Sequence, residues 1–312
     1  MTRPANTFAG LDLLAALGVV VIWDLNFVAM KYSLRDFTPF QLGFFRYVFA
    51  VLPLIFIVPK PRLSWRWLVP AGLAQLGQFG LLFMALQVGM TAALASVLMQ
   101  TQVFFTTLLG VALLGERLSG PLRAGLVLAA VGLLCFGLNF AGGSATVGIT
   151  VLGLVLNLGG AFMWAASNIV AHKAQAAQPG YDPLQFVVWM SLVPILPFGL
   201  MAWFFEPAAT YGHWRHASLG GWLGVAYLGW FATIAAYAMW TGLLKRHPAN
   251  RVAPFSLGVP VIGLAAGMLT LGEHVKAWQW AGSACVVAAL GVVMFGGRVA
   301  VLNRPRKPRQ PA

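Results

Sequence analysis

The chain of 312 residues is 60% hydrophobic and 9% charged, which excludes an ordinary soluble domain. Its apolar residues form continuous runs of about 20, the length at which a helix spans the bilayer core. Transmembrane β-barrels show a weaker alternation over segments of about ten residues, so we expect an all-α polytopic membrane protein.

The net charge of +13, the cysteines and the histidines suggest no further class. The basic residues are scattered between apolar runs and line no helix or groove, so nucleic acid is not an expected partner. Cys135 and Cys285 lie inside apolar runs and match neither a metal-binding spacing nor a disulfide framework. The five histidines lie in loops or at the ends of spans and form no metal spacing. We therefore expect no metal, no cofactor and no enzymatic activity.

Ten apolar segments are each long enough to cross a membrane as a helix. In chain order they are roughly residues 11–33, 39–58, 66–87, 91–114, 121–139, 148–172, 183–204, 218–243, 250–271 and 276–297. The links are short, and the longest, around residues 206–215, holds no independent domain. The first run continues as a full-length span, so no removable signal peptide is expected.

The basic residues in the links predict the orientation of the chain. With the N-terminus in the cytoplasm, fifteen of the twenty Lys and Arg residues fall on the inner side. Arg46 lies within a span, and the four residues that fall outside are Lys31, Arg35, Arg215 and Lys276. This bias predicts that both termini are cytoplasmic. Residues 298–312 are expected to be a disordered basic tail near anionic headgroups.

An internal repeat relates the two halves of the chain. Residues 38–53 match residues 182–197 without a gap, and residues 108–125 match residues 265–282. Identical residues in corresponding positions include Pro39 and Pro183, Gln41 and Gln185, Pro53 and Pro197, Gly110 and Gly267, and the Leu-Gly-Glu triplets at 114–116 and 271–273. We therefore predict two five-helix units, at residues 1–142 and 143–297, followed by the tail.

Five is an odd number of spans, so the second unit must enter the membrane from the opposite side. Inverted repeats related by an axis in the membrane plane are a transporter architecture, with the binding site at mid-membrane between the repeats. Such carriers work by alternating access, in which one part of the bundle rocks against another. The repeat is the main indication of function in the residues alone.

The first span carries polar and aromatic residues where a lipid-facing helix would carry Leu or Val. Residues 22–31 read IWDLNFVAMK and include Trp23, Asp24 and Asn26. The sixth span offers a second copy, in which MWAASNIVAHK sets Trp164 against Trp23. We expect both helices to face the same polar cavity.

Asp24 is the only carboxylate deep within a span, where it costs at least about 2.5 kcal/mol unless it faces protein or water and has a partner. It lies about 18 Å along the first helix, and Arg46 lies about 10 Å along the second from the opposite face, so the two depths nearly coincide. Three interpretations stay open: a buried ion pair with Arg46, a proton site, or a contact to the ammonium group of a substrate.

Other polar and aromatic side chains lie at a similar depth. Gln78 and Gln100 are near the middle of their helices, and Trp164 and Tyr237 are too deep for an interfacial belt. Such residues also serve as cross-links between helices or as plain packing. The candidate substrate-binding residues are Trp23, Asp24, Asn26, Arg46, Gln78, Gln100, Trp164, Asn168 and Tyr237.

Prolines and glycines predict where helices break. Pro254 and Pro260 remove backbone donors from the ninth span and predict a kink or break there. In each of the two Gly-Glu pairs, the glycine is expected to end one helix and the glutamate to favour the N-terminal dipole of the next.

Several local motifs occur together along the chain. They are WDLNFVAMK at residues 23–31, Arg46 in the second span, Gln78 in the third, LMQTQVFF at 98–105, RVAPFSLGVPVIG at 251–263 and the two Gly-Glu turns. In this combination the chain resembles the drug/metabolite transporter superfamily, specifically its ten-helix EamA-type exporters of amino acids and related metabolites. The resemblance covers roughly residues 14–295, and it is greatest to exporters of cysteine-pathway metabolites and of aromatic or broad-range amino acids. In one departure from the family pattern, Asp24 replaces the usual glycine.

The resemblance implies an exporter in the bacterial inner membrane with a central cavity between the two halves. The expected function is therefore the export of amino acids, over a broad range, by alternating access. In this interpretation Arg46 holds the substrate carboxylate, and Asp24, Trp23 and Trp164 face its ammonium group. A proton-coupled exporter of cations or drugs is the alternative, favoured if Asp24 is unpaired and titrates, and a polytopic membrane enzyme is less favoured. The expected partners are the small-molecule substrate and the lipid bilayer, with no obligate protein partner.

Overall fold

The computed structural model describes residues 10–115, 118–138, 149–247 and 252–302, and within these ranges it contains helices but no strand. Nine helical segments in the described ranges are long and apolar enough to cross a membrane, and a shorter apolar helix, Phe255–Leu271, is the tenth. The predicted ten-helix membrane fold is confirmed. The predicted boundary at residues 142 and 143, Glu116 of the first Gly-Glu pair and residues 303–312 of the tail lie outside the described residues. The tail was predicted to begin at residue 298, but residues 298–302 continue the last helix, Ala277–Leu302.

Some spans are one helix, and others are formed by two or three helical pieces. The helices are α1 (Gly10–Ser33), α2 (Pro39–Val51), α3 (Trp65–Gln87), α4 (Ala92–Met99), α5 (Gln102–Leu114), α6 (Gly120–Leu138), α7 (Val151–Ala177), α8 (Pro183–Met190), α9 (Ile195–Phe205), α10 (Leu219–Ala226), η4 (Tyr227–Ala235), α11 (Ala236–Arg246), η5 (Ala253–Leu257), α13 (Gly258–Leu271) and α14 (Ala277–Leu302).

Hydroxyl side chains fix the starts of several helices. Thr38, Thr91, Thr150 and Ser218 each accept a hydrogen bond from the backbone N–H three residues on, at the starts of α2, α4, α7 and α10. These bonds satisfy N–H groups that have no partner within their own helix. The short links of the sequence therefore coincide with capped helix ends.

Within the described residues five spans are interrupted, and only one interruption was predicted. The second span passes from α2 to the 3-10 turn η1 (Leu54–Phe56). The ninth span begins as the 3-10 turn η5 before α13, which confirms the break expected at Pro254. The fourth span breaks between α4 and α5, the seventh breaks between α8 and α9, and the eighth contains the π-helix η4. At three of the unpredicted sites, those in the fourth, seventh and eighth spans, a hydroxyl side chain donates a hydrogen bond to a carbonyl of the preceding turn. Thr101 donates to Leu98, Ser191 to Val187 and Thr233 to Leu228. Such bonds satisfy carbonyl groups at an irregular backbone.

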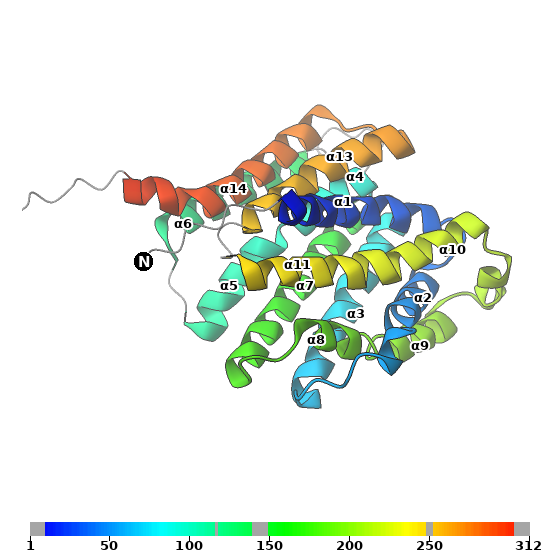
Figure 1. Ribbon diagram of the computed structural model, residues 1–312. Helices are drawn as coiled ribbons and strands as arrows, with labels where there is room; N and C mark the ends of the chain where they lie inside the picture. Colours follow the sequence, from blue (N-terminus) through cyan, green and yellow to red (C-terminus); the bar gives the residue numbers. More distant parts are fainter. Residues whose placement is uncertain (1–9, 116–117, 139–148, 248–251, 303–312) are drawn as a thin grey trace, which may run out of the picture.

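The helices pack in pairs that join the two halves of the chain. Helix α1 runs between α13 and α11, and α3 packs along α7 (Figure 1). Helix α6 packs along α14, α2 along α9, and α4 along α13. In terms of the ten spans, the fifth pairs with the tenth, the second with the seventh and the fourth with the ninth. Each of these pairs joins corresponding helices of the two predicted units.

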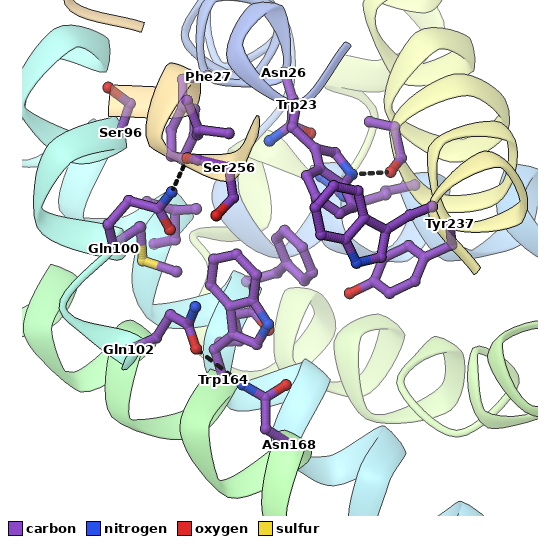
Figure 2. Close-up of a pocket in the computed structure, with 18 residues that line it drawn as sticks. Trp23, Asn26, Phe27, Ser96, Gln100, Gln102, Trp164, Asn168, Tyr237 and Ser256 are labelled. Atoms are coloured by element: carbon purple, nitrogen blue, oxygen red, sulfur yellow. Dashed lines mark hydrogen bonds between the residues drawn. The ribbon is translucent and has the colours of Figure 1, made fainter. Parts of the chain in front are cut away.

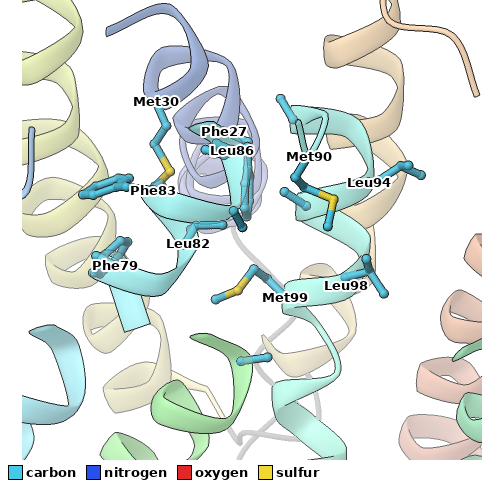
Figure 3. Close-up of a cluster of buried hydrophobic side chains, with 14 of the residues drawn as sticks. Phe27, Met30, Phe79, Leu82, Phe83, Leu86, Met90, Leu94, Leu98 and Met99 are labelled. Atoms are coloured by element: carbon cyan, nitrogen blue, oxygen red, sulfur yellow. The ribbon is translucent and has the colours of Figure 1, made fainter. Parts of the chain in front are cut away.

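The largest buried apolar cluster of the described residues draws on helices of both halves, and its part between α1, α3 and α4 is shown in Figure 3. Phe27 and Met30 of α1 meet Phe83 and Leu86 of α3, and Met90 lies in the link that follows. These side chains fill the half of the bundle toward the C-terminal end of α1. Apolar side chains therefore fill much of the space between α1, α3 and α4 toward that end.

The same end of the bundle holds Lys31, and we call it the Lys31 end. The Lys31 ammonium donates to the carbonyl oxygens of Leu86 and Met90, at 2.7 and 2.9 Å, and so ties α1 to the end of α3. Carbonyls at the end of a helix lack a partner within that helix, and a cationic donor suits such a C-terminus.

Three carboxylates at the Lys31 end cap helices of the opposite half of the chain. Glu273 accepts from the N–H groups of Ala92 and Ala93 at the start of α4, at 2.8 Å each. Glu206 accepts from the N–H of Phe40 in α2, and Asp36 from the N–H of Ser218 at α10. The Lys31 end is thus held closed by hydrogen bonds that cross between the halves.

For the second Gly-Glu pair, the prediction for the glycine is confirmed and the prediction for the glutamate was wrong. Gly272 has φ 63° and ends α13 as predicted. Glu273 does not serve the next helix, α14. Its carboxylate reaches the open N–H groups of α4 instead, because α4 packs directly against α13.

Burial raises the pKa of Glu206, and hydrogen bonds from Thr38 and from the backbone of Phe40 act in the opposite direction. This carboxylate lies just beyond the end of α9, where it accepts those bonds at the start of α2.

Helices α6 and α14 approach closely at a pair of glycines. A Cβ atom added to Gly132 would lie 2.9 Å from the Gly282 carbonyl oxygen, and one added to Gly282 would lie 2.9 Å from that of Gly132. Small residues at such crossings let two backbones meet in the membrane.

We expect Gly282→Ala to destabilise the protein, by about 1–3 kcal/mol, because the new methyl group meets the Gly132 backbone and the buried ring of Phe136. Gly291→Ala on the same helix is the matched control, since nothing lies within 4 Å of its added Cβ. Thermal unfolding in detergent measures both. Equal melting temperatures for the two variants would contradict the close approach.

Candidate functional site

A cavity of about 260 Å³ lies among helices of both halves of the chain. It is lined by Trp23, Asn26, Phe27, Arg46, Gln78, Phe79, Leu82, Ser96, Met99, Gln100, Gln102, Trp164, Asn168, Ala232, Tyr237, Trp240, Ser256 and Val259. Eight of the nine residues predicted to bind substrate are among them, and the exception is Asp24.

Trp23, Tyr237 and Trp240 form one wall of the cavity, on the side of α1 and α11 (Figure 2). The rings of Tyr237 and Trp240 lie 5.7 and 5.4 Å from that of Trp23, centroid to centroid. The indole N–H of Trp23 donates to the Ala232 carbonyl at 3.2 Å. Ala232 belongs to the π-helix η4, and π-bulges are frequent at functional sites. The orientation of Trp23 is thus fixed by packing and by one hydrogen bond.

Trp164 and Asn168 project from α7 on another side of the cavity (Figure 2). The Asn168 amide donates to the side-chain oxygens of Gln102 and Thr106, at 2.8 and 3.2 Å. Gln100 donates to the Ser256 carbonyl of η5 at 3.2 Å. The bonds of Asn168 connect α7 to α5. The bond between Gln100 and Ser256 connects the break after α4 to the turn η5 before α13.

Gln78 differs from these amides. It is 4% exposed, and its side-chain oxygen is buried without a hydrogen-bond partner. A buried amide oxygen left unpaired costs about 1–3 kcal/mol. Gln78 therefore offers the cavity an acceptor that the protein itself does not use.

Arg46 brings the cavity a positive charge that no carboxylate neutralises within the described residues. It is 3% exposed, and its guanidinium donates to the Asn26 side-chain oxygen at 3.1 Å. The guanidinium carbon lies 3.8 Å from the centre of the Phe79 ring, a cation–π contact. Its Nε has no hydrogen-bond partner. The arginine is thus held in place but keeps a free donor.

The predicted ion pair between Asp24 and Arg46 is absent, and that interpretation was wrong. No contact within 4 Å joins these two described residues, and both Asp24 oxygens lack a hydrogen-bond partner. The prediction compared depth along the helices and neglected direction. Successive helical residues point about 100° apart, so Asp24 faces away from the side of α1 that carries Trp23 and Asn26. It lies instead against Gly263 of α13.

Sequence reasoning did not select several other residues of the cavity wall. Gln102, Ser256 and Trp240 are polar or aromatic groups within spans, but nothing separated them from ordinary packing. Two residues apart, Gln100 and Gln102 would point about 200° apart in a regular helix. Both reach the cavity because α4 stops at Met99 and α5 starts at Gln102. Ser96 and Phe79 carried no signal that the sequence alone made visible.

Comparison with known proteins gives consistent matches along the chain. A family model described as the EamA-like transporter family matches residues 11–138 and residues 151–295. The chain is 39% identical over 293 residues to a "Probable amino-acid metabolite efflux pump" of Salmonella typhimurium, covering 92% of this chain and 96% of the relative. It is 37% identical over 289 residues to a protein of the same description from Escherichia coli, with the same coverage. A solved crystal structure with 19% sequence identity aligns with a TM-score of 0.62, over 93% of this chain and 98% of the other, and shows the fold alone.

The hydrogen bond between Arg46 and Asn26 predicts which pair of residues is energetically coupled. We expect Arg46→Gln and Asn26→Ala to be non-additive, with a coupling of about 0.5–3 kcal/mol, because they share a contact. Arg46→Gln and Asp24→Asn are the control pair and should add within about 0.5 kcal/mol. Unfolding measurements on the single and double variants decide the matter. Coupling in the second pair and none in the first would show that Arg46 pairs with Asp24 after all.

Proposed function

Because the chain belongs to the EamA-like transporter family, we propose that it exports amino acids and related metabolites through the cavity lined by Arg46, Gln78 and the tryptophans. The names of the Salmonella typhimurium and Escherichia coli relatives support this activity. The observation that carries the proposal is the chemistry of the cavity. One guanidinium group, several aromatic faces and one unpartnered amide oxygen meet in about 260 Å³.

Each part of an amino acid has a complementary group in this cavity. The substrate carboxylate binds the guanidinium of Arg46, whose Nε has no partner in the protein. The ammonium group donates to the side-chain oxygen of Gln78 and faces the aromatic rings. The rings of Trp23 and Trp164 accept side chains of different sizes, since aromatic faces bind apolar groups without directional bonds. This arrangement favours a broad range of zwitterionic substrates.

The cavity argues against the alternative of a cation or drug exporter. Its volume lies below the roughly 300–1,000 Å³ typical of sites for drug-sized ligands. Its charged group is a cation, Arg46, which repels a cationic solute. Asp24 is unpaired, as that alternative required, but it does not line the cavity. Membership of a transporter family likewise favours transport over enzymatic activity.

Transport proceeds by alternating access between the two five-helix units, residues 1–142 and 143–297. The packing of corresponding helices against each other supports an inverted repeat. In such a carrier, exchanging the conformations of the two units converts the state open to one side into the state open to the other. The hydrogen bonds at the Lys31 end represent the state closed on that side. Reopening it requires Glu273, Glu206 and Asp36 to release the helix starts that they cap.

Orientation in the membrane follows from the distribution of basic residues. Both termini lie in the cytoplasm, so the Lys31 end faces outward and the cavity is reached from the cytoplasm in this state. The chain is a multi-pass membrane protein, and the two efflux relatives come from bacteria, which supports a bacterial inner-membrane location. Its partners in this proposal are the amino-acid substrate and the bilayer.

Replacing Gln78 with Leu tests the cavity as the transport site. The change removes a buried acceptor that has no partner, so stability should stay equal or rise, whereas amino-acid export should fall at least tenfold. Export from liposomes preloaded with labelled amino acids measures the loss. Gln87→Leu, the same substitution at an exposed position of α3, is the control and should transport normally. Undiminished export by a folded Gln78→Leu protein would place the site elsewhere.

Cysteine labelling tests the orientation. In a background with Cys135 and Cys285 replaced by Ala, a membrane-impermeant maleimide added to intact cells should modify His213→Cys and spare Arg306→Cys. Labelling of permeabilised cells controls for reactivity at both positions. The reverse pattern would overturn the assignment of both termini to the cytoplasm.

A further inference from the structure

The most unusual polar group outside the cavity is Asp24. Its side chain is fully buried in the middle of α1, and neither carboxylate oxygen has a hydrogen-bond partner. It lies at a tight junction of three helices. A Cβ added to Gly263 of α13 would come 3.1 Å from the Asp24 Oδ1 atom and 2.3 Å from the Oγ atom of Ser96 in α4. A side chain at position 263 would clash with Ser96 and crowd the carboxyl group of Asp24.

No positive charge compensates Asp24 from the helices packed against it. The described parts of α4, α10 and α13 carry no acid or base. The titratable group of η4 is Tyr227, whose hydroxyl donates to the Ile22 carbonyl at 2.8 Å. Tyr237 of α11 lies beside Trp23. Arg46 of α2 is bonded to Asn26 on another face of α1. A buried ionised carboxylate without a charge partner is among the most costly groups in a membrane protein, so this packing favours the neutral acid form of Asp24.

Asp24 is nevertheless close to the cavity. Ser96, which shares its contact with Gly263, lines the cavity, and so do Trp23 and Asn26, which lie within two residues of Asp24 along the chain. The junction also joins the two halves of the chain, since α1 and α4 belong to the first and α13 to the second. A movement of one half against the other therefore changes the surroundings of this carboxyl group directly.

We propose that Asp24 is a proton-binding site that couples export to the inward movement of protons. This inference rests on the transport function proposed above. When the junction of α1, α4 and α13 opens toward the outside, the ionised carboxylate takes a proton from external water. Closure of the Lys31 end buries the neutral acid, as in this structure. Binding of substrate beside Ser96 and Asn26 then returns the proton to cytoplasmic water, so one proton moves in for each substrate moved out.

The test separates transport from its coupling. Purified protein in liposomes is assayed for exchange of a labelled amino acid at equal pH on both sides, and for accumulation driven by a pH gradient with proton flux followed by a trapped dye. We expect Asp24→Asn to keep exchange within about threefold of the parent and to lose at least tenfold in driven accumulation and in proton flux. Asp182→Asn is the control and should keep both activities, because Asn also caps helix starts well.

Asp24→Gly is a second variant, which removes the side chain in case the amide folds poorly at this junction. The proposal is overturned if a folded Asp24→Asn or Asp24→Gly protein still accumulates substrate under the gradient as the parent does, or if the parent moves no protons. It is also overturned if both folded variants lose exchange, since Asp24 would then contact the substrate itself. Absence of exchange in the parent refutes the transport function, independently of the role of Asp24.

Discussion

Inside a bilayer no water is available to satisfy backbone groups, so an irregular helix is stable only where protein or a polar cavity supplies partners. Three of the irregular segments lie where a polar cavity supplies such partners. The break at Gln100 and Thr101, the turn η5 and the π-helix η4 all border the same cavity. At each of these sites a side chain donates a hydrogen bond to a backbone carbonyl. Thr101 donates to the carbonyl of Leu98, Gln100 to that of Ser256, and Trp23 to that of Ala232. The cavity and the irregular backbone stabilise each other.

The same constraint explains how the Lys31 end is closed and why closure can be reversed. Each helix that starts there exposes N–H groups that need acceptors, and three are capped by carboxylates from the other half of the chain. These acids lie at span ends, where water can replace them when the halves separate. Exchanging a carboxylate for water at a helix start costs little compared with exposing the apolar cluster of Phe27, Met30 and Phe83 beside it. The hydrogen bonds therefore define the closed geometry, and apolar burial supplies most of its stability.

Much of this could be predicted from the sequence, because the bilayer imposes strong patterns on composition. The spans, their number and the break at Pro254 follow from apolar length and from a missing backbone donor. Eight of the nine proposed site residues border the cavity because polar and aromatic groups at mid-span have few other places to lie. The direction in which a side chain points around its helix was harder to predict from the sequence. The predicted Asp24–Arg46 pair was wrong because equal depth says nothing about the face of the helix. Gln102 was not selected because it reaches the cavity through the break between α4 and α5, which the sequence pattern did not predict.

The separation of Asp24 from Arg46 has a physical consequence that a direct ion pair would remove. Paired, the two charges would neutralise each other, and the cavity would offer neither a cation for a carboxylate nor a carboxyl group free to exchange a proton. With Asn26 bonded to Arg46 on one face of α1 and Gly263 packed over Asp24 on another, one helix carries both groups and keeps them apart. The guanidinium remains available to an anion in the cavity, while the acid responds to the packing of α13. In the coupling proposed above, a rotation or tilt of α1 would act on both groups at once, and so would connect substrate binding in the cavity with the protonation of Asp24.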